Sequence, residues 1–212
     1  MAGIAGSLNA AGFQATGFFS ANMTGNISAL SDHLGLAQLG WAALFSSLVA
    51  AFIAGAFVSG LLIEAGRKHA VRAIYAYSIV LEAALLVALS LIDVFLPAAQ
   101  SGSILVLGLS FIMGVQNAAT TRISNARVRT THVSGMATDI GIGLALLANN
   151  SPERANVVAL LRLHVSTITS FVVGGIAGVV IYLAIGDWLL LVCAVLLFAI
   201  SLPEARRASR DA

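Results

Sequence analysis

Long apolar runs separated by short polar segments occupy most of the 212-residue chain. A helix crosses a hydrocarbon core about 30 Å thick with roughly 20 apolar residues. A shorter apolar stretch at residues 2–17 adds one more candidate helix. The chain therefore predicts an all-α polytopic membrane protein with about six transmembrane helices. The five runs that have this length and apolarity are 40–63, 73–92, 103–121, 163–185 and 188–202.

Composition supports a membrane environment. Hydrophobic residues make up 59% of the chain and charged residues only 9%, whereas soluble domains carry about 25% charged residues. The single cysteine, Cys193, lies in the last apolar run, so we expect a packing residue rather than a disulfide or a reactive thiol. The N-terminal stretch lacks the basic start of a cleavable signal peptide.

The basic residues lie in a few short clusters beside apolar runs. Cytoplasmic loops of membrane proteins carry an excess of Lys and Arg, so the clusters predict which ends of the helices face the cytoplasm and place both termini there. Because each cluster is short and adjoins a span, we expect no nucleic-acid partner. The clusters are Arg67, Lys68 and Arg72; Arg122, Arg127 and Arg129; Arg154 and Arg162; and Arg206, Arg207 and Arg210.

Two semi-apolar segments, 18–39 and 130–150, start and end on the same predicted side of the membrane. We expect each to be re-entrant, since irregular backbone at membrane depth is tolerated only when it is buried in protein or lines a wet cavity.

The two segments belong to halves with similar motifs, which we assign to 1–100 and 101–212 of a single membrane domain, 1–212. Asn9 matches Asn117, and Gly25 matches Gly135. Three crossings in each half would turn the second copy upside down, as in the inverted 3+3 repeats of transporters.

Gly25 and Gly135 are predicted to break the chain, with half-helices over 26–34 and 136–148. The start of a helix presents free N–H groups and the positive end of its dipole. Two such ends meeting at the membrane centre would suit an anion or a polar solute. The alternative is that each Thr or Ser followed by Gly merely caps an ordinary helix at the membrane surface.

The predicted substrate site collects the polar and glycine positions at and near the two breaks. No side chain is assigned a catalytic or metal-binding role, and no cofactor is expected, because the histidines lack partners at ligand spacing and no nucleotide-binding or hydrolase motif is present. The predicted residues are Asn9, Asn22, Thr24, Gly25, Asn26, Gln116, Asn117, Arg129, His132, Ser134, Gly135, Thr138 and Asp139.

For three of these polar residues, and for one further acid, the sequence allows two alternative roles. Asp139 is either a proton-linked or substrate-contacting acid, with His132 and Arg129 as its nearest partners, or an acid stabilised by the helix dipole. Glu82, in the middle of a span, is either a gate or relay or the partner of a buried polar group. The amides of Gln116 and Asn117 either line a polar path or join neighbouring helices.

Four motifs resemble those of the YoaK-type family of bacterial multi-pass inner-membrane proteins, a domain of unknown function. They are AGSLNAAGF at 5–13, FSANMTGN at 19–26, MGVQNA at 113–118 and VRTTHVSG at 128–135. The resemblance implies an inner-membrane protein with about six spans and supplies no substrate. The family is expected to carry Asp where Asn9 stands, so a protonation role at that position is not carried over.

We therefore expect a transporter or channel for a small polar or anionic solute, which is not an enzyme and has the bilayer and the solute as its partners. The alternatives are a scaffold or sensor subunit, or a membrane enzyme that uses Asp139 and His132. Small-residue pairs at Gly55 and Ser59, and at Gly174 and Gly178, predict close helix packing between the halves or across a homodimer.

Overall fold

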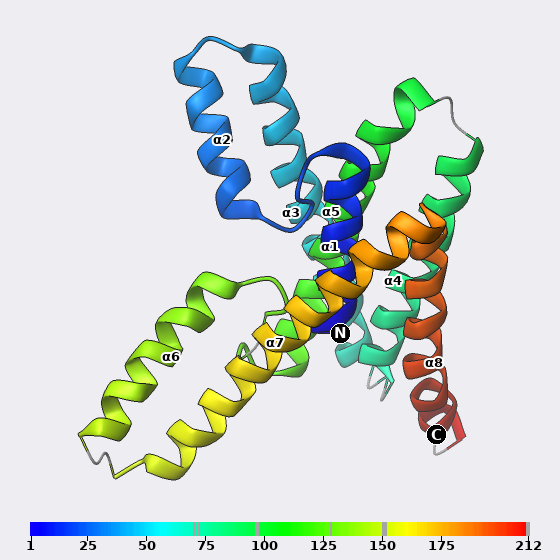
Figure 1. The fold of residues 1–212 in the computed structure, drawn as a ribbon. Helices are drawn as coiled ribbons and strands as arrows, with labels where there is room; N and C mark the ends of the chain where they lie inside the picture. Colours follow the sequence, from blue (N-terminus) through cyan, green and yellow to red (C-terminus); the bar gives the residue numbers. More distant parts are fainter. Residues whose placement is uncertain (70, 72, 96–97, 128, 150–151, 211–212) are drawn as a thin grey trace.

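A computed structural model of the protein describes residues 1–69, 71, 73–95, 98–127, 129–149 and 152–210. These residues form helices joined by short connections (Figure 1). Arg72 and Val128, which the sequence analysis used, lie outside the described residues. The helices are α1 (Ala2–Thr16), α2 (Met23–Gly35), α3 (Leu39–Lys68), α4 (Ile74–Phe95), α5 (Ala98–Ile123), α6 (Val133–Ala148), α7 (Arg154–Ile185) and α8 (Trp188–Arg210).

The predicted all-α class is confirmed, but the predicted six spans in a 3+3 arrangement are not supported. Among the described helices, α3, α7 and most of α4 and α5 are long and apolar enough to cross a membrane. The segments expected to be re-entrant, 18–39 and 130–150, contain α2 and α6. The helix α1 has 15 residues, which corresponds to about 22 Å at 1.5 Å per residue.

Two pairs of helices are in backbone contact through glycines. The helix α1 packs on α7, and α5 packs on α3. A Cβ atom at Gly6 would lie 2.0 Å from the carbonyl oxygen of Phe171, and one at Gly114 would lie 2.0 Å from that of Phe52. Only glycine allows helix axes to approach so closely.

The glycines on the partner helices are equally restricted. A Cβ at Gly55 would lie 1.9 Å from the oxygen of Phe111, and one at Gly174 would lie 2.0 Å from the oxygen of Gly3. The close packing predicted for these small-residue faces is therefore confirmed within the chain. A homodimer stays a prediction.

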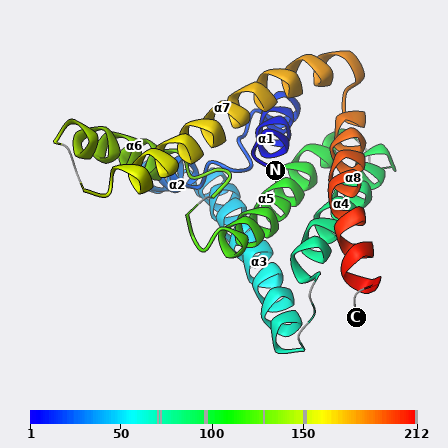
Figure 2. The same cartoon turned by 90° about the horizontal axis from the view of Figure 1, so that it is seen from below.

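The main hydrophobic core lies between α1, α4, α5 and α8. Its fully buried members include Leu8, Leu86, Leu109 and Leu197. The helices α4 and α8 run side by side (Figures 1 and 2) and close this side of the core.

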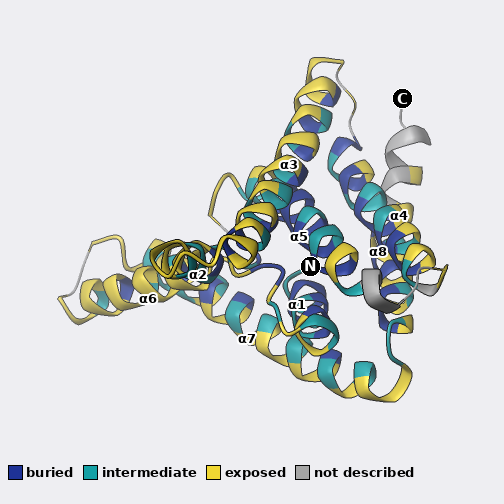
Figure 3. Cartoon of the chain, turned by 90° about the horizontal axis from the view of Figure 1, so that it is seen from above, coloured by how far each residue is buried: buried dark blue, intermediate teal, exposed yellow. Residues whose placement is uncertain are grey.

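Two helical hairpins project from the opposite side of the molecule. The helix α2 packs along the first half of α3, and α6 packs along the first half of α7. Figure 1 shows α2 and α6 starting near the centre and diverging, one upward and the other downward. Figure 3 shows that the hairpins and the outer faces of α3 and α7 are largely exposed. Exposed apolar side chains on these faces include Phe57 and Leu61 on α3 and Ile176 and Val180 on α7.

We predict that Gly114→Ala destabilises the protein by about 1–3 kcal/mol, because its methyl group would force α3 and α5 apart. Gly141→Ala, within α6, is the matched control, because a Cβ there meets no atom within 4 Å. The buried Cys193 allows thermal unfolding in detergent to be followed with a thiol-reactive coumarin maleimide. Equal midpoints for the two variants would contradict the close packing.

Candidate functional site

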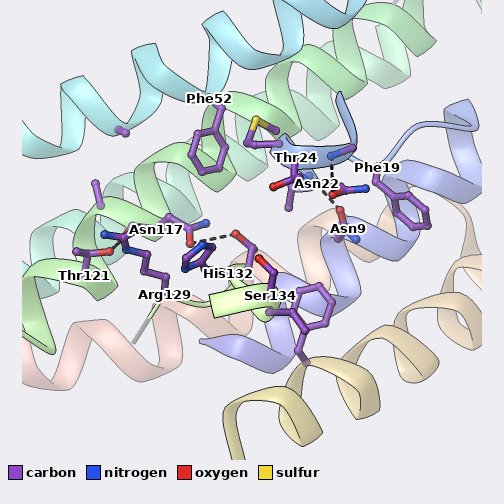
Figure 4. Close-up of a pocket in the computed structure, with 18 of the residues that line it drawn as sticks. Asn9, Phe19, Asn22, Thr24, Phe52, Asn117, Thr121, Arg129, His132 and Ser134 are labelled. Atoms are coloured by element: carbon purple, nitrogen blue, oxygen red, sulfur yellow. Dashed lines mark hydrogen bonds between the residues drawn. The ribbon is translucent and has the colours of Figure 1, made fainter. Parts of the chain in front are cut away.

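A cavity of about 1040 Å³ lies between the two hairpins and the central helices. Its walls come from α1, α2, α3, α5, α6 and α7 and from the connections that precede α2 and α6. Figure 4 shows Asn9, Asn22 and Thr24 on one side of the cavity and Asn117, His132 and Arg129 on the other. The polar lining residues are Asn9, Asn22, Thr24, Ser28, Asn117, Thr121, Arg122, Arg129, Thr131, His132 and Ser134.

Both α2 and α6 begin at this cavity. Asn22 and His132 are their N-cap residues, and Thr24 and Ser134 follow in the first turns. The first N–H groups of a helix have no partner within the helix. Two helix N-termini from different parts of the chain thus face one open cavity.

The breaks predicted at Gly25 and Gly135 are wrong, because both glycines lie in the first helical turn. The backbone turns earlier, where φ is 79° at Gly17 and 50° and 63° at Asn125 and Ala126. These values belong to the left-handed region, which ends the preceding helix. The half-helices predicted over 26–34 and 136–148 correspond to α2 and α6, which start three residues earlier.

Gly25 and Gly135 instead lie directly beside the N-cap side chains. A Cβ at Gly25 would lie 2.2 Å from Nδ2 of Asn22, and one at Gly135 would lie 2.6 Å from Cε1 of His132. The Gly25 N–H donates to Oδ1 of Asn22 at 3.1 Å, which is a standard helix cap. His132 makes no such bond, so the start of α6 keeps more of its N–H groups for a ligand.

Two asparagines hold the connections that lead into α2 and α6. Oδ1 of Asn9, on α1, accepts the N–H of Ala21 at 3.0 Å. Oδ1 of Asn117, on α5, accepts the hydroxyl of Thr131 at 3.1 Å. Each amide therefore fixes the chain one residue before an N-cap while its own side chain lines the cavity.

The cavity is positively charged. Its lining contains Arg122 and Arg129 and no aspartate or glutamate. Nη2 of Arg122 lies 2.7 Å from Oε1 of Glu64, which neutralises it. Arg129 is exposed and forms no ion pair with any described carboxylate.

Several predicted site residues lie outside the cavity lining. Asn26 is buried at the base of α2, with Nδ2 donating to the carbonyl of Phe19 at 3.5 Å. The hydroxyl of Thr138 donates back to the carbonyl of Ser134 within α6. Gln116 is buried against Glu82, as the paired alternative for Glu82 anticipated.

Asp139 also lies away from the cavity, and its predicted partners are wrong. Its Oδ2 is 3.9 Å from Nδ1 of the buried His164 on α7, not near His132 or Arg129. The reason is geometric, because Asp139 lies on the face of α6 that packs on α7. Nε2 of His164 lies 3.1 Å from the carbonyl oxygen of Arg127, so the pair ties α7 to the connection before α6.

Sequence reasoning missed several lining residues. Phe52 and Phe171 lie one helical turn before Gly55 and Gly174 on helices judged only as spans. Thr121 lies one turn after Asn117, and this helical spacing could have identified it. Within the described part of the chain, no three metal-ligating side chains lie together.

We predict that Asn9→Ala lowers the free energy of unfolding by about 1–3 kcal/mol, because the buried N–H of Ala21 would lose its acceptor. Gln14→Ala, at an exposed position of the same helix, is the control. Thermal unfolding monitored through Cys193 measures both. A loss of stability that is no larger for Asn9→Ala would show that the amide does not hold the connection.

Comparison with known proteins agrees with the resemblance found in the sequence, because both lead to a family of unknown function. Residues 1–202 match the family described as "Protein of unknown function (DUF1275)". No curated protein and no solved structure is significantly similar to the chain. Because the match covers nearly the whole chain, the protein belongs to this family of unknown function.

Proposed function

We propose that the protein resides in the bacterial inner membrane and moves a small anion through the central cavity. The observation that carries this proposal is Arg129, which pairs with no described carboxylate and lies at a cavity with two helix N-termini and no acidic side chain among its described lining residues. Helix N-termini and arginine both favour negative charge. The volume, about 1040 Å³, is at the upper end for small-molecule sites and leaves room for a solute with its water.

A membrane location is supported by the outer faces of α3 and α7. These helices expose large apolar side chains such as Phe57, Ile176 and Leu183 along stretches long enough to cross a bilayer. Monomeric soluble proteins rarely expose contiguous apolar surface on this scale.

An inverted repeat of two four-helix halves, α1–α4 and α5–α8, is supported by matching contacts. Gly6 meets the carbonyl of Phe171 as Gly114 meets that of Phe52. Asn9 and Asn117 play the same part before α2 and α6. Transporters with inverted repeats place the substrate at the interface of the repeats, often on the starts of broken helices.

Orientation follows from charge. The end of α3 at Lys68, the start of α7 at Arg154 and the end of α8 lie toward the lower side in Figure 1. The positive-inside rule makes this side cytoplasmic, along with both termini. The helix α2 then rises toward the outside, and α6 descends toward the cytoplasm.

We expect a small oxyanion or carboxylate to raise the thermal midpoint of the wild-type protein in detergent, because ligands that bind the folded state stabilise it. Sulfate, phosphate, nitrate and acetate would be compared with chloride at equal ionic strength, using Cys193 as the reporter. Arg129→Gln should lose the anion-specific part of the shift. Arg162→Gln, an exposed arginine outside the cavity, should keep it.

Sulfate and phosphate stabilise folded proteins in general, and the shift that remains in Arg129→Gln measures this general effect. An equal shift in wild type and Arg129→Gln would refute the anion site. The stabilising anion would then be tested for uptake into proteoliposomes. Binding without uptake would favour the sensor or scaffold alternative over transport.

Sided labelling tests the inverted arrangement of α2 and α6. In a Cys193→Ser background, a membrane-impermeant maleimide should label Ser28→Cys from outside and Thr138→Cys from the cytoplasmic side. Both positions are exposed, whereas Leu86→Cys, at a fully buried position, should label from neither face. Labelling of Ser28→Cys and Thr138→Cys from the same face would contradict the repeat.

A further inference from the structure

A buried acid, Glu82, is connected to the wall of the cavity by a series of side-chain hydrogen bonds. Glu82, in the middle of α4, is only 1% exposed. Its Oε1 accepts a hydrogen bond from Nε2 of Gln116 at 2.6 Å. Its Oε2 has no hydrogen-bond partner among the described atoms, and no described cation lies within ion-pair distance. A carboxylate left in this state is costly, so the group favours binding a proton.

Gln116 connects this acid to the segment before α6. The Oε1 of Gln116 accepts the hydroxyl of Thr130 at 3.0 Å, and Thr130 is itself buried. The same hydroxyl lies 3.5 Å from Oδ1 of Asn117, which also accepts the hydroxyl of Thr131 at 3.1 Å. Asn117 and Thr131 line the cavity. A continuous chain of hydrogen bonds thus runs from the acid on α4 to the wall of the site.

The direction of each bond in this chain depends on the charge of Glu82. A carboxylate only accepts hydrogen bonds, so the Gln116 amide must turn its NH₂ toward Glu82 and its oxygen toward Thr130. A protonated carboxyl gains an O–H, which can donate to the Gln116 oxygen when the amide turns by half a rotation. The NH₂ group of Gln116 then donates to the oxygen of Thr130, and the Thr130 hydroxyl becomes free to donate to Asn117.

We propose that Glu82 is a proton-binding site coupled to the central cavity through Gln116 and Thr130, so that the proton is the ion that drives the transport proposed above. One proton moves from a hydronium ion to the Glu82 carboxylate, leaving water and a neutral carboxyl. The purpose of this site rests on the proposed transport function. Its coupling to the cavity rests only on the hydrogen-bond chain.

The surroundings of Glu82 leave few other groups to titrate with it. The charged groups of α3 lie in its last two turns, and α5 presents the neutral Gln116. The titratable groups of the core beside α4 include the Cys193 thiol of α8 and the amino group of Met1 before α1. The remaining titratable residues of the packed helices α3, α4, α5 and α8 are Glu64, Arg67, Lys68, Tyr75, Tyr77, Asp93, Arg122, Glu204, Arg206, Arg207 and Arg210.

The coupling predicts a pH-dependent structure at the start of α6 that does not require a known solute. In the Cys193→Ser background, which also removes the neighbouring thiol, the maleimide labelling rate of Ser134→Cys would be measured from pH 5 to 9. The measurement is repeated with Glu82→Gln added, and the ratio of the two rates cancels ionisation of the thiol. We expect this ratio to change about fivefold or more across the titration, as for typical coupled sites.

Two controls separate the hydrogen-bond chain from other effects. Ser28→Cys lines the cavity on α2, outside the chain, and its ratio should stay constant. Thr130→Val keeps Glu82 and Gln116 but removes the hydroxyl between them and Asn117, so the Ser134→Cys rate should lose the same pH step. This second variant also keeps the test open if Glu82→Gln does not fold.

A constant ratio for Ser134→Cys would overturn the proposal. A pH step that survives in Thr130→Val would overturn the hydrogen-bond route. If wild type and Arg129→Gln showed equal anion shifts, the pH-dependent labelling would still stand. The labelling experiment contains no added solute. The two proposals can therefore fail independently.

Discussion

Direct contact between helix backbones at four glycines determines the architecture. Gly6 and Gly174 bring α1 against α7, and Gly55 and Gly114 bring α3 against α5. The packing places Asn9 and Asn117 on helices that are in direct backbone contact with their neighbours. Their amides in turn fix the connections before α2 and α6. The position of the cavity therefore depends on contacts that involve no polar group of the site.

The helical class could be predicted from the sequence, because apolar length is a local signal, and several of the polar residues selected as a candidate site line the cavity. The ends of the helices were harder to predict from the sequence. Basic residues mark the limits of the apolar runs, but α3 continues to Lys68 and α7 already begins at Arg154. The helix continues through charged residues because these have good helix propensity and extend into water.

The two glycine motifs mark the starts of α2 and α6, but not for the predicted reason. Gly25 and Gly135 suggested breaks, since glycine permits unusual backbone angles. In the structure, their missing side chains make room for Asn22 and His132. The partner of Asp139 escaped prediction for a related reason. His164 is distant in sequence, and only the packing of α6 on α7 brings it close.

The pairing of α1 with α7 also has a consequence for biosynthesis. Residues 2–16 are synthesised long before the helix against which they pack, α7, which ends at Ile185. The glycine face of α1 remains uncovered until α7 has been made. The main core combines α1 and α4 with α5 and α8, so neither half completes its core alone, and α1 finds its packing partner only late in synthesis.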